Sequence, residues 1–365
     1  MLFSIIIIPM KIKITLILSL IFIVIILKIV TFSKNFVENY YSRLIYKKIA
    51  GTLNRISSNF TFSLGELLLF LIIIAVIIFI IIAFKKSFFN GNIKSLADKS
   101  KTVLNYLYIL ACFMIVIYIV FLLVWGLNYH RVPLIDNYPP KEINNDDIYL
   151  LADTLVRNIN ELKNEMKYKE INTNYQALNR MIESEYNKVF EEFEFLNMHY
   201  SKTKPIMISK LFLHLQITGI YSPFTSEANV NILIPSISIP FTIAHEMAHQ
   251  IGIAYEDEAN FISYIACSKH TDPFVRYSAN FEALLYVLGE LKRDENYAHL
   301  MSNLNSGTKE EIKKYYEFWQ QYMGNLSKVS QKVNDTYLKA NSQDDGIKSY
   351  SRVVKLLVLY HNINP

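Results

Sequence analysis

The stretch FTIAHEMAHQIGIAYEDEANF, from Phe241 to Phe261, decides how the rest of this chain is interpreted. It is apolar, yet it carries His245, Glu246 and His249 at fixed spacing, and a small acidic cluster follows at once. From Asn231 to Tyr255 the only formally charged side chain is Glu246. A carboxylate in so apolar a run needs a partner or a chemical role, because an isolated buried charge is costly.

His245, Glu246 and His249 form the pattern H-E-x-x-H. Residues four apart on a helix lie one turn apart on the same face, so the two imidazoles can bind one Zn²⁺ ion together. Glu246 can then reach a water at the open position of the metal and act as a general base. The competing interpretation is a pair of core histidines bonded to backbone or water, with Glu246 in a salt bridge. The apolar neighbours favour the metal site, because they exclude water and raise the proton affinity of Glu246.

A third ligand lies within reach of the two histidines. Glu256 follows His249 after a glycine-containing turn and is expected to open a second helix, with Asn260 one turn further along the same face. A carboxylate ligand with a polar group beside it suits a His-His-Glu zinc site, because a ligating histidine needs its other ring nitrogen held in place. Glu258 is the competing carboxylate, and the acidic cluster could also simply complement the helix dipole.

The segments around the motif are expected to form a helix and a strand. Thr242 or Pro240 can start the motif helix, and Gly252 can end it through a left-handed cap. The preceding NILIPSISIP, residues 231–240, is predicted to be a short edge strand because it is rich in β-branched residues and contains prolines. Such an edge could hold an extended peptide by backbone hydrogen bonds. The segment GIYSPFTSEANV, residues 219–230, is predicted to be a loop.

The segments PFTIAHEMAHQIGIAYEDEANFISYIAC and GIYSPFTSEANVN resemble an uncharacterised bacterial family of membrane proteins. Its members have three N-terminal membrane spans followed by a zincin-like domain, and the resemblance covers most of the chain. It implies a zinc-peptidase-like fold without a proven activity. Compared with zincins whose third ligand opens an E-x-x-x-D motif, Glu256 matches the ligand and Asn260 replaces the aspartate. Compared with H-E-x-x-H-x-x-G-x-x-H proteins, Gly252 matches the glycine and Tyr255 occupies the position of the third ligand.

Composition places a membrane segment in the first third of the chain. The chain has 365 residues, of which 52% are hydrophobic, and a net charge of +5. This charge is small and the polar part has no compact basic stripe, which argues against nucleic acid as a partner. The two cysteines, Cys112 and Cys267, exclude a disulfide framework and a cysteine-rich zinc site. A metal here must use histidine and carboxylate.

Three apolar runs are each close to the ~20 residues that cross a bilayer as a helix. They span about residues 14–30, 67–84 and 106–125. The alternative is buried helices of a large soluble core, which seldom come three in a row. The first run could also be a cleaved signal peptide, but the TFSKNFVENYY that follows offers no small-residue cleavage site, which predicts a retained anchor. We therefore expect a multi-pass protein of the cell membrane that contacts the lipid bilayer.

The loops around these spans carry unequal positive charge. Placing the N-terminus and the second loop in the cytoplasm gathers seven cations there, whereas the opposite orientation gathers six. The seven are Lys11, Lys13, Lys85, Lys86, Lys94, Lys99 and Lys101, and the six are Lys34, Arg43, Lys47, Lys48, Arg55 and Arg131. The positive-inside rule therefore favours, by a small margin, an extracytoplasmic C-terminal domain. The first loop, residues 35–56, has helical periodicity and is expected to lie on the membrane surface.

The predicted architecture is mainly α-helical. A membrane domain covers residues 1–130, a linker rich in proline, asparagine and aspartate covers 131–146, and a mostly helical zincin-like α+β domain with a small edge-strand sheet covers 147–365. Helical patterns are expected over residues 147–166, 173–190, 280–297 and 309–340.

The expected function is that of a membrane-anchored zinc metallopeptidase that hydrolyses peptides or proteins. Its zinc ligands are His245, His249 and Glu256, its general base is Glu246, and Tyr277 or Tyr350 could steady the oxyanion. One alternative is a catalytically inactive zincin-like scaffold or partner-binding membrane protein. The other is intramembrane proteolysis, but the aspartate ligand in an L-D-G setting that this mechanism uses is absent from the sequence.

Overall fold

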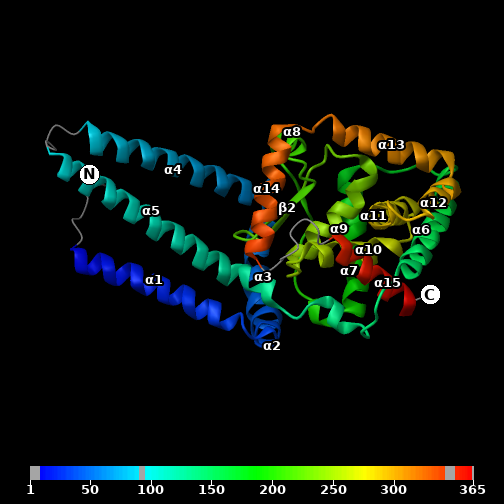
Figure 1. The fold of residues 1–365 in the computed structure, drawn as a ribbon, viewed down its shortest axis with the longest axis horizontal. Helices are drawn as coiled ribbons and strands as arrows, with labels where there is room; N and C mark the ends of the chain where they lie inside the picture. The colour runs from blue at the N-terminus through cyan, green and yellow to red at the C-terminus, as the bar shows by residue number, and fades with distance from the viewer. Residues whose placement is uncertain (1–8, 90–94, 342–349, 364–365) are drawn as a thin grey trace.

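The computed structural model describes residues 9–89, 95–341 and 350–363, and these are mainly helical with one small sheet (Figure 1). The helical elements before the sheet are α1 (Met10–Val30), α2 (Lys34–Phe36), the π-helix η1 (Val37–Tyr46), α3 (Lys47–Ser57), α4 (Leu64–Phe88), α5 (Leu96–Val124), the 3₁₀ turns η2 (Gly126–His130) and η3 (Leu134–Asn137), α6 (Asn145–Met166), α7 (Tyr175–Glu192) and η4 (Glu194–Leu196). Those that follow are α8 (Ser209–His214), η5 (Ser236–Ser238), α9 (Ile239–Gln250), α10 (Glu256–Ser268), α11 (Pro273–Leu291), α12 (Tyr297–Asn303), α13 (Ser306–Gln320), α14 (Asn325–Ala340) and α15 (Tyr350–Ile363).

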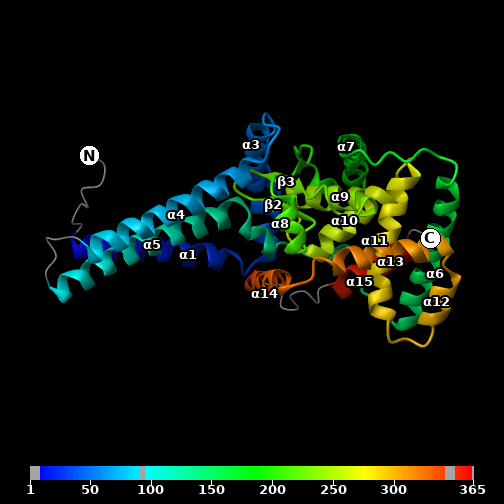
Figure 2. The same ribbon diagram turned by 90° about the horizontal axis from the view of Figure 1, so that it is seen from above.

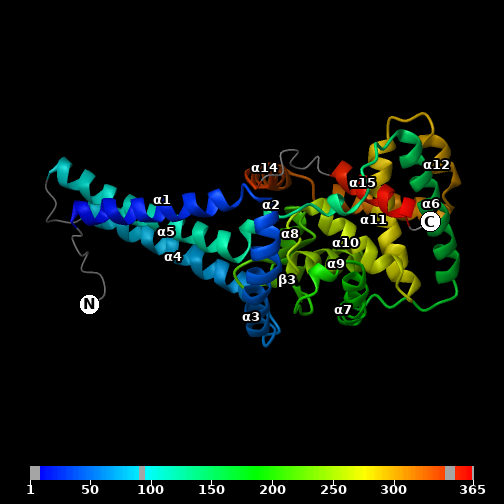
Figure 3. The same cartoon turned by 90° about the horizontal axis from the view of Figure 1, so that it is seen from below.

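Helices α1, α4 and α5 are the three predicted apolar helices. They contain 21, 25 and 29 residues, and each is long and apolar enough to cross a membrane. All three begin before the apolar runs. Polar caps explain this for α4 and α5, where the hydroxyls of Ser63 and Ser95 accept from backbone N–H groups in the first turn, and Pro9 precedes α1. The three helices project together from the remainder of the molecule (Figures 2 and 3). This arrangement is consistent with a membrane protein.

The segment between the first two apolar helices packs against the remainder of the molecule. Tyr46, at the end of η1, is fully buried, and its hydroxyl donates to the carbonyl of Gln250 at 3.1 Å. Glu38 in the same segment accepts two hydrogen bonds from Arg131, at 2.9 and 2.8 Å, and both side chains are buried. Arg131 also donates to the carbonyl of Gly252 at 3.0 Å. The first membrane loop and the predicted linker therefore both contact the end of α9.

The sheet has the strand order β1-β3-β2, with β1 (Lys204–Pro205) parallel to β3 (Glu227–Val230) and β2 (Gly219–Ser222) antiparallel to it. The register pairs Gly219 with Val230 and Ser222 with Glu227. The predicted loop over residues 219–230 is therefore wrong, because it contains the hairpin of β2 and β3.

The predicted strand over residues 231–240 is also wrong. Its residues form a turn, the 3₁₀ turn η5 and the first residues of α9. Proline explains the difference: Pro235 precedes η5, and Pro240 lies in the first turn of α9, where its missing N–H group costs no hydrogen bond. The real sheet lies directly upstream, and β3 contacts α9.

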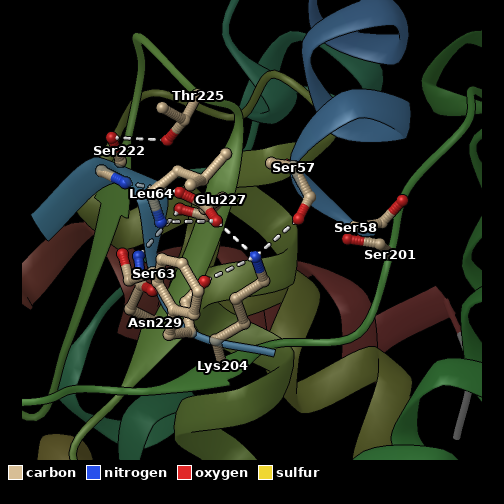
Figure 4. Close-up of polar contacts among 12 residues, drawn as sticks. Ser57, Ser58, Ser63, Leu64, Ser201, Lys204, Ser222, Thr225, Glu227 and Asn229 are labelled. Atoms are coloured by element: carbon tan, nitrogen blue, oxygen red, sulfur yellow. Dashed lines mark hydrogen bonds and ion pairs between the residues drawn. The ribbon is translucent and has the colours of Figure 1, made fainter. Parts of the chain in front are cut away.

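The sheet also holds the start of α4 (Figure 4). The buried Glu227 carboxylate accepts from the backbone N–H groups of Leu64 and Gly65, at 3.1 and 2.6 Å. These N–H groups belong to the first turn of α4, which has no helical partner for them and carries partial positive charge. Lys204 of β1 completes the cluster by pairing with Glu227 and donating to the carbonyl of Ser57 at 2.7 Å.

Helix α9 lies inside the core of the polar part of the chain, and not among the apolar helices. It contacts α7, α10, α11 and the sheet, and nearly all of its residues are buried. Helix α11 packs against α6 and α10 to extend this core. The H-E-x-x-H helix is therefore positioned by helices on several sides and by a short sheet.

Candidate metal centre

The metal-binding pattern is carried by α9 and the start of α10. His245 and His249 lie one turn apart on α9, and Glu256 is the first residue of α10. The connecting turn is short because Gly252 adopts φ +95°. Its conformation confirms the predicted left-handed cap, with the N–H of Ile253 bonded to the carbonyl of Ala248 at 3.1 Å. The turn brings the first residue of α10 back onto the histidine face of α9.

The three side chains converge on one point. The Nε2 atoms of His245 and His249 are 3.1 Å apart, and the Glu256 carboxylate oxygens lie 3.2 Å from the first and 3.6 Å from the second. A zinc ion in tetrahedral coordination, about 2.0–2.1 Å from each donor, would hold its donor atoms roughly 3.3 Å apart. The spacing of these three groups therefore fits a divalent cation without rearrangement.

Each histidine forms a hydrogen bond through its Nδ1 atom, and this bond orients the ring and leaves Nε2 to face a metal. His249 Nδ1–H donates to the carbonyl of Ile253 at 2.7 Å, and a carbonyl can only accept. His245 Nδ1 is 2.8 Å from Oδ1 of Asn260, so it donates to that amide oxygen. In the deprotonated form that binds a metal, each ring would therefore direct the lone pair of Nε2 toward Glu256. Two such lone pairs and one carboxylate form the donor set that zinc prefers.

Replacement of Asn260 by alanine should weaken zinc binding. The change removes the acceptor that orients His245, and the loss of a group that holds a ligating histidine typically costs about 10–100-fold in metal affinity. Competition against a chromophoric chelator measures the affinity of the purified full-length protein. Asn260→Asp, which keeps the acceptor, is the matched control and should bind at least as tightly as the original protein. An unchanged affinity in Asn260→Ala would contradict this role.

Glu256 and His249 shift each other's pKa values. Burial alone would raise the pKa of Glu256, but the two neighbouring imidazoles lower it well below the usual range. Burial alone would lower the pKa of His249, but the Glu256 carboxylate raises it to about 9. The cluster can therefore hold a proton in the place where a cation would bind, and proton and metal would compete.

Glu246 lies beside this cluster without belonging to it. Burial raises the pKa of its carboxyl group to about 7, although the two histidines oppose the shift. Its Oε2 atom is buried and has no hydrogen-bond partner within the described part of the chain. The backbone of Gly219 in β2 passes so close that a Cβ atom there would lie 2.3 Å from Glu246 Oε1. The carboxylate is thus positioned between the histidine face of α9 and the edge of the sheet.

Substitution of Gly252 is expected to destabilise the turn that joins α9 to α10. Gly252→Ala places a side chain at φ +95° and a Cβ atom 2.8 Å from the Tyr46 ring. A left-handed non-glycine residue costs about 1–3 kcal/mol, so we expect a lower melting temperature. Gly289→Ala is the control: it lies within α11 with nothing within 4 Å of the added Cβ atom, and should stabilise the protein slightly. Thermal unfolding of both variants in one detergent provides the comparison.

The competing third ligands point elsewhere. The Glu258 carboxylate accepts from the backbone N–H of Leu134 at 2.6 Å. Burial, followed by its neighbour Asp257, raises its pKa to about 8. Tyr255 donates its hydroxyl to the carbonyl of Tyr129 at 2.6 Å. Among the described histidines, cysteines and carboxylates, His245, His249 and Glu256 are the group whose ligand atoms lie within 4.8 Å of one another.

Tyr277, one of the two tyrosines expected to serve the oxyanion, is bonded away from this site. Tyr277 is 1% exposed and bonds to Glu311 and Thr308, and the side chain of Tyr350 lies outside the described residues. Instead, the hydroxyls of Tyr129 and Tyr337 lie 3.0 Å apart. Burial chiefly raises the pKa of both hydroxyls, and the ring centre of Tyr129 lies 6.2 Å from that of Tyr255, the residue before Glu256.

Sequence reasoning missed this tyrosine pair because its members are 208 positions apart. Trp125, at the end of α5, also reaches the site, with its ring centre 6.2 Å from that of His249. The only local signal was the aromatic cluster that follows the third apolar run, which suits a membrane boundary equally well.

Comparison with known proteins gives one match. A family model described as a protein of unknown function (DUF3810) matches residues 41–358, which is well over half of the chain. No curated protein and no solved structure matches. The matched region includes the two later apolar helices, the sheet and the histidine cluster.

Proposed function

The chain belongs to the DUF3810 family of proteins of unknown function, and from the chemistry of its site we propose that it is a membrane-anchored zinc metallopeptidase. The observation that carries the proposal is the convergence of His245, His249 and Glu256 beside the separate carboxylate of Glu246, whose buried Oε2 has no hydrogen-bond partner among the described residues. Three ligands and one free base are the minimum that this type of hydrolysis requires. We further propose that the helical part with its small sheet is zincin-like, since α9 and α10 supply all four groups and β2 lies against Glu246.

Each residue has a distinct task in this proposal. His245, His249 and Glu256 hold the metal, and Asn260 and the Ile253 carbonyl orient the two rings. When bound, a zinc ion supplies a Lewis acid that polarises the scissile carbonyl and promotes ionisation of water. Glu246 accepts the proton of the attacking water and transfers it to the leaving amine. A pKa raised to about 7 by burial suits a group that must both accept and donate near neutral pH.

The edge of the sheet suggests a peptide as the substrate. β2 pairs only with β3 among the described strands, so its other edge can accept the backbone of an extended chain. Gly219 lies on β2 directly against Glu246. A peptide added along this strand would run past the general base. Backbone hydrogen bonds provide affinity there, which favours peptide or protein substrates without a strict side-chain requirement.

The proposal also places the site outside the cytoplasm. The C-terminal ends of α1 and α5 and the N-terminal end of α4 lie on the side of the histidine cluster (Figure 1). The first residues of α1 and α5 and the last residues of α4 then share the opposite side (Figure 1), and a count of seven cations against six in the sequence favours the cytoplasm for that side. An antibody against a C-terminal tag should bind intact cells. Binding that requires permeabilised cells would reverse the orientation.

Metal content and hydrolysis of a peptide mixture test the function. Full-length protein in lipid nanodiscs should contain about one zinc ion per chain by elemental mass spectrometry. It should cleave members of the mixture, stop after chelation, and recover when zinc is restored. Protein that holds zinc in this stoichiometry but cleaves nothing would support a catalytically inactive scaffold that binds a partner. Protein that holds no metal after reconstitution would refute both forms of the proposal.

A further inference from the structure

Helix α14 presents an apolar face to its surroundings. Leu326, Val329, Val333 and Tyr337 follow one another at intervals of three, four and four residues, so they share one side of the helix. They are 52%, 60%, 63% and 40% exposed. A continuous apolar face on a helix that also carries charged residues is typical of an interaction surface.

The contacts of Tyr337 show which way the apolar face of α14 points. The hydroxyl of Tyr337 bonds to that of Tyr129, and Tyr129 lies in η2, directly after α5. The ring of Tyr129 also packs against Trp125, the residue at the end of α5. The apolar face of α14 is therefore on the side of the helix that looks toward the end of the third apolar helix.

The position of α14 agrees with this direction. In Figure 1 the orange helix α14 runs across the long axis of the molecule, at the level where α4 and α5 join the remainder of the chain. Figures 2 and 3 show it end-on at the same level. If α1, α4 and α5 cross a bilayer, α14 lies crosswise at the boundary between that bilayer and water.

A neighbouring segment extends the apolar surface. Met207 and Leu211, before and within α8, are 47% and 46% exposed. The backbone N–H of Met207 donates to the Glu66 carboxylate in the first turn of α4, at 2.9 Å. Gln331 of α14 bonds to Gln216, which follows α8, at 2.9 Å. Both segments are thus attached at the boundary end of α4.

The exposed side of α14 opposite the apolar face is polar. Ser327 and Leu338 are buried against the protein, whereas Lys328, Lys332 and Lys339 lie on the side away from the apolar face. An interfacial helix has this distribution, with apolar side chains among the upper acyl chains and cations at the level of the headgroups. Lysines at a membrane surface add attraction to anionic lipids.

We propose that α14 lies in the interfacial layer of the bilayer, with Leu326, Val329 and Val333 in contact with acyl chains. The helix is a second membrane contact, separate from the three apolar helices. It bears directly on the candidate site, because Tyr337 is on the same helix and its hydroxyl faces Tyr129 near Glu256. Lipid contact then holds the tyrosine pair beside the metal cluster. The inference does not depend on peptidase activity.

Site-directed fluorescence tests the contact. Single cysteines introduced as Val329→Cys, Val333→Cys and, as controls, Lys328→Cys and Lys332→Cys are labelled with bimane in a Cys112→Ala background; Cys267 is fully buried and stays unlabelled. The full-length variants are reconstituted in vesicles of phosphatidylcholine and phosphatidylglycerol. Emission from positions 329 and 333 should shift to the blue and be quenched by brominated acyl chains. Emission from the two lysine positions should be quenched by iodide in the water phase.

Three results would overturn the proposal. Equal iodide quenching at all four positions would mean that the face is in water. A blue shift at 329 and 333 without quenching by brominated lipid would mean that protein covers the face. Disulfide crosslinks between Val333→Cys chains would identify that cover as a second copy. Each labelled variant is first checked for a single elution peak, so that misfolding is not mistaken for exposure.

Discussion

Glu246→Gln is expected to lower the rate of peptide hydrolysis by about 10²–10⁴-fold, the usual contribution of general acid–base catalysis. Glutamine has nearly the same shape but cannot accept the proton of the attacking water. Zinc content should stay unchanged, because Glu246 is outside the triangle of His245, His249 and Glu256. Stability should not fall either, since the variant replaces a buried carboxylate, whose Oε2 has no partner within the described residues, by a neutral group.

Glu258→Gln is the matched control for this result. Its carboxylate is also buried with a raised pKa, but it accepts from Leu134, and a glutamine oxygen can accept the same bond. The control should keep both zinc and activity. If Glu246→Gln cleaves peptides at the original rate, another group is the base. If Glu258→Gln loses zinc while Glu246→Gln keeps it, the identity of the third ligand is wrong.

Local patterns were sufficient for much of the architecture. The three apolar helices and the mainly helical remainder follow from composition and periodicity, which depend on neighbouring residues. The approach of Glu256 to the two histidines also has a local origin. Four-residue spacing aligns His245 and His249, and Gly252 allows the short turn that returns the chain. The metal-binding role of these residues stays a prediction.

Other features could not be predicted because they depend on contacts between distant segments. The strand over residues 231–240 was predicted from β-branched residues, but the prolines direct the chain into η5 and α9. The true strands are only two to four residues long and carry polar residues such as Glu227, whose place in the sheet depends on Lys204. The predicted helix over 309–340 is two helices, α13 and α14, with Gly324 between them. Because the chain breaks between α13 and α14, α14 takes its own direction, and its Tyr337 reaches Tyr129.

The second large effect is expected at the join between the sheet and α4. Lys204 and Glu227 have side chains that are 9% and 1% exposed, so their pair is shielded from water. Lys204→Met removes the lysine partner of the Glu227 carboxylate, which keeps its bonds to the N–H groups of Leu64 and Gly65, and it leaves the Ser57 carbonyl without its lysine donor. Breaking a buried pair by removing one partner costs about 3–5 kcal/mol, because an uncompensated charge stays buried.

Thermal unfolding of the full-length protein in nanodiscs measures this cost. A domain of 150–250 residues loses roughly 2–4 °C per kcal/mol, so the melting temperature should fall by on the order of 10 °C. Lys202→Met is the control, because Lys202 is 52% exposed and its pair with Glu183 spans 3.5 Å. Exposed pairs of this kind contribute about 0–1 kcal/mol, so that variant should unfold within a few degrees of the original protein.

A double variant separates the charge from the packing. Lys204→Met with Glu227→Gln removes both charges, and the glutamine oxygen still accepts from the first turn of α4 (Figure 4). If the uncompensated carboxylate causes the loss, the double variant should lose less stability than Lys204→Met and Glu227→Gln lose in sum, by roughly 1–3 kcal/mol of coupling. Additive losses would instead mean that the lysine acts through its bonds to the Ser57 and Phe62 carbonyls. Because β3 packs against α9, zinc affinity measured on the same variants reports whether strain at the start of the second apolar helix reaches the histidine cluster.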